Sequence, residues 1–362
     1  MERTLLSAHD LHHTIHSPGL LGDVSNTLIT EPNLTTMHSS HSLALDTSGA
    51  ITEIRQDYLH EYYVLVAPKR ANRPYDTLAR EHPMVESASS PRLDQQTSVL
   101  DLNRHGEPTQ DDTWSVKVVE NKFPALTMDN SKAYGKQELV IDTPISNQSF
   151  GELESHQIEL ILQAYQQRSQ ALHALEHIKY VSIFRNDGYE AGASLAHAHS
   201  QIMGLPMIPP DIAREATAVS AYESDHKRNA YDAIIRFEQH DGSRIIAEND
   251  DWIAFCPYAS RWQMEAWILP KQAGALLEDF TKAQFINLAP LLKQLAGRLT
   301  GADMSYNMII EQGSTAAQRL TIKFCGRNVV SPWGGLEVGT GIIVNVIPPE
   351  SAAKWYRAQS LN

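Results

Sequence analysis

The stretch LAHAHSQIMGLP, residues 195–206, places two imidazoles and a carboxamide at alternating positions. Successive side chains of a strand point to opposite faces, so His197, His199 and Gln201 share one face if the segment is extended. Each such polar group costs about 1–3 kcal/mol if it is buried without a partner. The row therefore indicates a metal site, a buried hydrogen-bond network, or nucleophilic catalysis by an imidazole.

Each of these three interpretations makes a different chemical demand. A metal site needs at least one ligand beyond the two histidines, and a network needs fixed polar partners. In nucleophilic catalysis, one neutral imidazole nitrogen attacks phosphorus and forms a phosphoramidate, while an acceptor holds the other nitrogen. The amide of Gln201 would then donate to a phosphate oxygen and stabilise its developing charge. The spacing alone leaves all three open.

The elements around this stretch repeat one order, strands followed by a helix and further strands. In the first set, strands are expected at 61–68, 114–126 and 135–144, a helix at 149–175, and strands at 180–188 and 195–206. In the second set, strands are expected over 243–258 and at 264–271, a helix at 278–301 with Thr281 as its N-cap, and strands at 305–313, 319–326 and 341–349. Residues 77–112 lack periodicity and are predicted to be a long loop. This pattern predicts an α+β fold of two related halves, each an antiparallel sheet with packed helices.

The same pattern sets the domain boundaries. Residues 1–48, rich in Ser, Thr and His, are predicted to be an N-terminal extension, followed by a first half at 49–206 and a second half at 207–362. Four histidines of the extension would hold a metal if they were helical, but a loosely packed segment is the simpler interpretation. These four are His9, His12, His13 and His16.

Composition narrows the class of protein. The net charge of −13 argues against a partner that is a nucleic acid or an anionic membrane, although local basic groups can still bind a phosphate. The two cysteines, Cys256 and Cys325, form no C-x-x-C pair and lie in apolar surroundings, which favours free buried thiols. The sequence has no 18-residue apolar run and no secretory leader pattern, so we expect a cytoplasmic protein.

The run VSIFRNDGYEAGASLAHAHSQIMGLPMIPP, residues 181–210, resembles the galactose-1-phosphate uridylyltransferase family of the histidine-triad superfamily. The matching positions are Phe184, Asn186, Gly188, Gly192, Ser194, His197, His199 and Gln201. Upstream, Arg70, Arg73 and Pro74 match an Arg-x-x-Arg-Pro motif, and Asn121, Lys122 and Phe123 match a second motif. Residues 252–271 and 334–353 resemble the C-terminal half, so the resemblance extends from about residue 50 to 355.

The resemblance implies a ping-pong nucleotidyltransferase of histidine-triad-like halves that acts as a homodimer. His199 would attack the α-phosphorus of a nucleotide donor and carry the nucleotide, Gln201 would hold the phosphate oxygens, and Glu337 would contact a sugar hydroxyl of the acceptor. The nucleotide and its phosphates would be bound by Arg70, Arg73, Asn121, Lys122, Phe123, Asn186, Gly192, Ser194 and His197.

Three functions remain open under this resemblance. The first is UMP transfer between a UDP-hexose and a hexose 1-phosphate. The second is transfer of AMP from adenylyl sulfate, ADP-glucose or a diadenosine polyphosphate to inorganic phosphate. The third, from another class, is a catalytically inactive nucleotide-binding protein.

Many members of the family bind metals, and the sequence lacks the ligands for them. Residues 86–103, where a cysteine pair is expected, hold no cysteine, and Ser146 stands at the position of a histidine ligand. Glu215 matches a ligand of a second metal, but Arg319 and Thr321 stand in place of its His-x-His pair. We therefore expect no metal and no cofactor, with His197 bonded to the backbone and Arg319 on the surface.

Overall fold

The computed structural model describes residues 51–68, 98–110, 112–195, 197–327 and 334–358. All of them belong to one compact unit, which extends from Leu45 to Asn362. The predicted extension at 1–48 and the motif containing Arg70, Arg73 and Pro74 lie outside the described residues.

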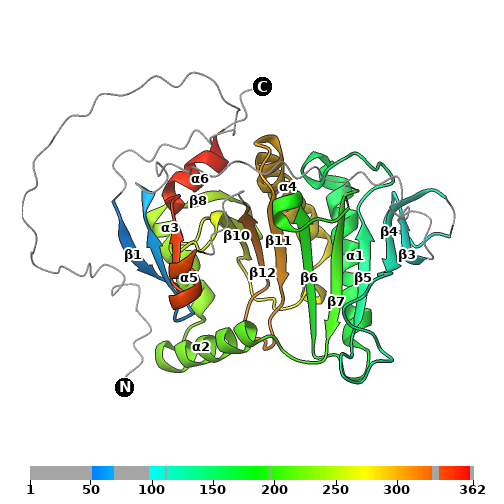
Figure 1. Cartoon of the computed structure of the whole chain (residues 1–362), viewed down its shortest axis with the longest axis horizontal. Helices are drawn as coiled ribbons and strands as arrows, with labels where there is room; N and C mark the ends of the chain where they lie inside the picture. Colours follow the sequence, from blue (N-terminus) through cyan, green and yellow to red (C-terminus); the bar gives the residue numbers. More distant parts are fainter. Residues whose placement is uncertain (1–50, 69–97, 111, 196, 328–333, 359–362) are drawn as a thin grey trace, which may run out of the picture. The chain divides into compact units, whose positions relative to one another are not determined.

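One continuous antiparallel sheet of ten strands dominates the described residues (Figure 1). Its spatial order is β3 (Ser98–Asn103), β4 (Trp114–Glu120), β5 (Lys136–Ile141), β7 (His199–Leu205), β6 (Tyr180–Asp187), β11 (Tyr306–Glu311), β12 (Thr321–Gly326), β10 (Gln263–Pro270), β9 (Trp252–Phe255) and β8 (Ile245–Glu248). A small second sheet holds β1 (Glu53–Gln56), β2 (Tyr63–Val66) and β13 (Ile343–Asn345).

The large sheet is built from two sets of five strands with the same internal order. The order β3-β4-β5-β7-β6 is repeated by β8-β9-β10-β12-β11, and the sets join where β6 pairs with β11. At this seam Asn186 lies opposite Asn307, and Phe184 lies opposite Ile309. The predicted α+β class with two related halves is confirmed. The boundary after residue 206 stays a prediction, because both halves share one sheet.

Helices α1 (Ser155–His173) and α4 (Lys282–Gly301) occupy equivalent places along the chain. α1 lies between β5 and β6, and α4 lies between β10 and β11. They pack against each other and bury apolar side chains beneath the sheet. Thr281 caps α4 as predicted, because its hydroxyl accepts from the backbone N–H of Gln284. The other helices are α2 (Pro210–His226), α3 (Ala230–Asp241), α5 (Gly335–Thr340) and α6 (Pro349–Arg357).

Two sequence predictions about strands were wrong. β3 lies within the expected loop at 77–112, and it pairs with β4 through two irregularities of register. Such irregularities interrupt the alternation of apolar and polar residues by which a strand is recognised. The strand expected at 114–126 ends at Glu120, because the side chain of Asn121 accepts from the backbone N–H of Phe123 and turns the chain.

Both cysteines are free and buried, as expected. Burial raises the pKa of the Cys256 and Cys325 thiols well above the usual value, which keeps them protonated and unreactive. None of the helices described is long and apolar enough to cross a membrane.

Candidate active site

Strand β7 lies between β5 and β6, and its two faces differ in surroundings. On the face toward α1, Ser200 accepts a hydrogen bond from the Tyr165 hydroxyl at 2.7 Å. His199 and Gln201, one residue to either side, therefore point to the opposite face. The predicted pair is thus placed on one strand face, directed away from the helix layer.

His199 is held as a neutral imidazole whose Nε2 carries no proton. Its Nδ1 lies 2.8 Å from the carbonyl oxygen of His197. Because a carbonyl only accepts, Nδ1 must carry the proton, and Nε2 of the neutral ring keeps its lone pair. The side chain is 8% exposed, and burial, reinforced by the nearby Arg185 guanidinium, lowers the pKa of His199.

This lowered pKa predicts an unusual pH dependence. His199 will bind a proton only below the ordinary imidazole value of 6.5, so nucleophilic attack should continue unimpaired into more acidic solution. The measurement is log(kcat/KM) of the first half-reaction against pH. The acid limb should lie below pH 6.5. An acid limb above that value would show that the environment of His199 does not suppress its protonation.

His197 has a different role from His199. It precedes β7, and its Nε2 donates to the carbonyl oxygen of Thr143 at 2.7 Å. This bond links the turn before β7 to the end of β5. A nitrogen that donates a proton in this way offers no lone pair to a metal.

The described side chains do not fit the zinc site that the family resemblance implies. Within the described ranges, no three residues among His, Cys, Asp and Glu come together as a metal-binding group. Ser146 offers only a hydroxyl, and Cys256 and Cys325 belong to the second half. The absence of a metal cofactor stays a prediction.

Gln201 is held by a residue that the sequence did not point to. The Nε2 of Gln137 donates to the Oε1 of Gln201 at 2.6 Å, and Gln137 is 8% exposed. On β5, Gln137 shares a face with Leu139, which lies opposite Gln201. The sequence feature that could have pointed to Gln137 is its position among apolar residues on the same strand face.

The end of β6 and the loop after it carry three of the predicted phosphate-binding residues, Asn186 on the strand and Gly192 and Ser194 in the loop. The Nδ2 of Asn186 lies 3.4 Å from the Gly192 carbonyl oxygen, while Gly192 and Ser194 are exposed. Gly192 has a φ of +86°, a conformation that favours glycine. Asn307 of β11 donates from Nδ2 to Asn186 Oδ1 and to the Ala191 carbonyl oxygen, each at 2.9 Å. The second half thus contributes a residue to this loop, and no sequence motif indicated that contact.

The segment after β4 reaches the same neighbourhood. The backbone N–H of Asn121 donates to the Gln137 carbonyl oxygen at 3.0 Å. Lys122 and Phe123 are exposed, and Phe123 is 79% accessible. The structure therefore connects these three predicted residues to β5, two strands from β6. Arg70 and Arg73 lie outside the described residues.

Glu337 is not brought together with His199 within one chain. It lies on α5, which packs against β13. Figure 1 shows α5 beside β1 and α3, with the strands of the second half between it and β7.

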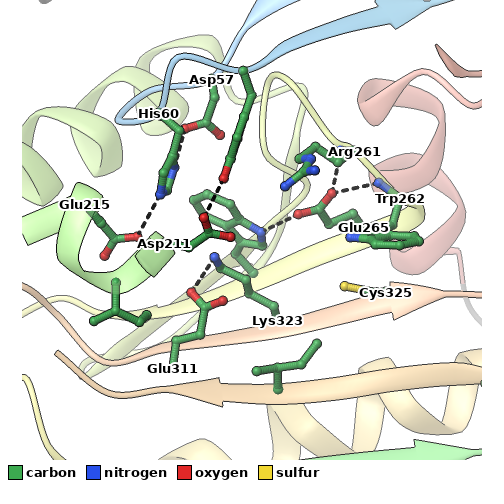
Figure 2. Close-up of a pocket in the computed structure, with 14 residues that line it drawn as sticks. Asp57, His60, Asp211, Glu215, Arg261, Trp262, Glu265, Glu311, Lys323 and Cys325 are labelled. Carbon is green, nitrogen blue, oxygen red and sulfur yellow. Dashed lines mark hydrogen bonds and ion pairs between the residues drawn. The ribbon is translucent and has the colours of Figure 1, made fainter. Parts of the chain in front are cut away.

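The second half carries a pocket that the sequence did not reveal. It has a volume of about 110 Å³ and lies over β10, β11 and β12, beneath the first turns of α2 and residues 57–62 (Figure 2). Lys323 forms an ion pair with Glu311 at its floor. Burial opposes the charge of this lysine, but Glu311 and Glu215 outweigh it and raise the pKa of Lys323. The Lys323 ammonium group therefore stays positively charged in the pocket.

The residues around Glu215 correct one expectation. The Oε1 atom of Glu215 accepts hydrogen bonds from the hydroxyl of Tyr231 and the amide of Gln318. Arg319, expected on the surface, is 5% exposed and forms an ion pair with Asp232 at 2.5 Å. That expectation was wrong because Arg319 lies just before β12, next to the first turn of α3, where the Asp232 carboxylate pairs with its guanidinium. Lys323 supplies positive charge near Glu215.

Comparison with known proteins agrees with this geometry. Residues 42–209 match the model of the galactose-1-phosphate uridyl transferase N-terminal domain, and residues 215–320 match that of the C-terminal domain. An ADP-glucose phosphorylase of Arabidopsis thaliana is 26% identical over 334 residues, covering 85% of this chain and 93% of that protein. A galactose-1-phosphate uridylyltransferase of Thermotoga maritima is 25% identical over 264 residues, covering 66% of this chain and 82% of that protein.

A solved structure supports the same assignment. The crystal structure of an ADP-glucose phosphorylase from Arabidopsis thaliana with bound ADP-glucose superimposes with a TM-score of 0.73 at 25% identity, covering 86% of this chain and all of that one. The two domain models together cover well over half of the sequence. The chain therefore belongs to the galactose-1-phosphate uridyl transferase family, a family of nucleotidyltransferases.

Proposed function

We propose that this enzyme moves a nucleoside monophosphate through a covalent bond to Nε2 of His199. The observation that carries the proposal is the bond from His199 Nδ1 to the His197 carbonyl oxygen, which leaves Nε2 unprotonated. Nε2 attacks the α-phosphorus of a nucleotide sugar, and the bond from that phosphorus to the sugar-phosphate oxygen breaks. The departing sugar 1-phosphate is a stable anion, and an acceptor phosphate then takes the nucleotide from His199.

The donor we favour is ADP-glucose, with inorganic phosphate as the acceptor. The support is the extent of the similarity: the Arabidopsis thaliana ADP-glucose phosphorylase aligns over 93% of its length. In this reaction the enzyme would form glucose 1-phosphate in the first half-reaction and ADP in the second.

A second candidate is UMP exchange between a UDP-hexose and a hexose 1-phosphate. Both domain models are those of galactose-1-phosphate uridyl transferase, and the Thermotoga maritima relative carries that name. The chemistry at His199 is the same in both candidates, so they differ in the nucleobase and the acceptor.

Intact-mass spectrometry separates these candidates. The protein is incubated with ADP-glucose or with UDP-glucose, without acceptor. We expect a mass gain of one AMP from ADP-glucose, and its loss on addition of inorganic phosphate with release of ADP. A gain of one UMP from UDP-glucose alone would favour the second candidate.

The same experiment tests whether the protein is an enzyme of this type at all. If neither donor, nor adenylyl sulfate or a diadenosine polyphosphate, gives an adduct while the protein binds nucleotide, the covalent proposal is wrong. The protein would then be a catalytically inactive nucleotide-binding member of the family.

We further propose that two copies of the chain complete the acceptor site. Glu337 lies on α5, away from β7 of its own chain, so a sugar contact by Glu337 requires a second copy. In this arrangement Arg70, Arg73 and the exposed Phe123 would contribute to nucleotide binding. The expected assembly is a homodimer.

A further inference from the structure

The orientation of the Gln201 amide is fixed by a chain of hydrogen bonds that begins at a backbone N–H. The N–H of Ala125 lies 2.9 Å from the side chain of Gln137. A backbone N–H only donates, so the Gln137 atom that faces it must be the oxygen, Oε1. The other end of the Gln137 amide, Nε2, then faces Gln201 at 2.6 Å and must donate to its Oε1.

This chain leaves one group of Gln201 for a ligand. With Oε1 occupied, Gln201 presents its Nε2 group, which carries two N–H donors. Among the residues that the structure describes, none accepts from that group. Gln201 is therefore set as a donor, the state needed to bind a phosphate oxygen.

We propose that Gln137 is a positioning residue that sets the Gln201 amide to donate toward the transferred phosphate. The proposal rests on the nucleotidyl transfer proposed above. Two further contacts support it. Gln137 is nearly buried on β5, which has β4 on one side and β7 on the other, so its amide has little freedom to turn. Its backbone oxygen also accepts from Asn121, so one residue joins the segment at 121–125 to the amide of Gln201.

The sharpest test is Gln137→Glu, which changes one group of nearly equal size. Either carboxylate oxygen still accepts from Ala125, but the carboxylate cannot donate to Gln201. The Gln201 amide should then turn its Nε2 toward the carboxylate and its oxygen toward the phosphate. We expect the rate constant for adduct formation to fall by about 10²-fold, the usual effect of losing one donor to a developing oxyanion. The KM for the donor should change much less.

Three readouts distinguish this role from a general structural defect. In the double variant Gln137→Glu/Gln201→Ala, the rate should equal that of Gln201→Ala alone, because the amide through which Gln137 acts is gone. The deficit of Gln137→Glu relative to wild type should shrink as the pH falls, because a protonated carboxyl donates again. Gln272→Glu, at an exposed site, makes the same chemical change and should behave as wild type.

Each outcome decides for or against the inference. A Gln137→Glu protein that forms the adduct at the wild-type rate overturns it, as do losses that multiply in the double variant. If Gln137→Glu does not fold by its thermal melt, Gln137→Met takes its place. That variant lets the Gln201 amide rotate freely and should be several-fold slower, and an unchanged rate would overturn the inference. Absence of any adduct in the wild type would instead reject the proposed function.

Discussion

Replacing His199 with asparagine should lower kcat for nucleotidyl transfer by about 10⁴-fold or more, the order seen when a covalent nucleophile is removed. Asparagine keeps a short amide that can still donate to the His197 carbonyl oxygen, as Nδ1 of His199 does. The fold around β7 should therefore survive, while the nucleophilic Nε2 is lost. The measurements are steady-state turnover and the mass of the protein after incubation with ADP-glucose.

A matched histidine gives the control for this experiment. His240 lies exposed near the end of α3, so His240→Ala should retain the wild-type rate and the adduct. If His199→Asn kept turnover within about 10-fold of wild type, transfer would proceed by direct displacement, without a nucleotidyl-histidine. An adduct that persists in His199→Asn would identify another residue as the nucleophile.

Replacing Arg185 with methionine should destabilise the protein by about 3–5 kcal/mol. The Arg185 guanidinium is 1% exposed and bonds to Asp142, which is fully buried at the end of β5. Without its partner, Asp142 would remain as a buried charge, which is the costly case. The measurement is the free energy of unfolding from urea titration.

Arg185→Met should also change the pKa of His199, because the guanidinium charge acts on that imidazole. Arg185 helps to lower the pKa of His199, whereas the Asp142 carboxylate raises it. Without the guanidinium, its lowering effect is lost while the raising effect of the Asp142 carboxylate stays, so the His199 pKa moves upward. The acid limb of the first half-reaction should therefore shift to higher pH than in the wild type.

Two further variants show whether the loss of stability in Arg185→Met comes from the unpaired Asp142 charge. Arg214 pairs with Asp211 on the surface of α2, so Arg214→Met should cost less than about 1 kcal/mol. Adding Asp142→Leu to Arg185→Met should recover much of the stability, because the unpaired charge is removed as well. A loss in Arg185→Met no larger than that of Arg214→Met would show that the buried pair is not important for stability.

Local patterns were sufficient for the main architecture and for the strand that carries His199 and Gln201. Alternation placed His199 and Gln201 on one face, since the side-chain period of a strand is two wherever that strand lies. It was wrong for His197, because the strand expected from residue 195 begins only at His199. The repeated order of strands and helices predicted two related halves, because an element's apolar period is a property of its own sequence. The edge strand β3 was not predicted, because its irregular register interrupts the alternation of apolar and polar residues.

The surroundings of His199 and Gln201 were decided by tertiary structure alone. Asn307 meets Asn186 only because β11 pairs with β6 in one register. Gln137 reaches Gln201 only because β7 inserts beside β5 rather than at an edge. Strand order and register follow from long-range pairing and packing, which no short stretch of sequence contains. The sequence by itself thus singled out His199 and Gln201 as candidates, and the assembled sheet decided which neighbours hold their protons and hydrogen-bond donors.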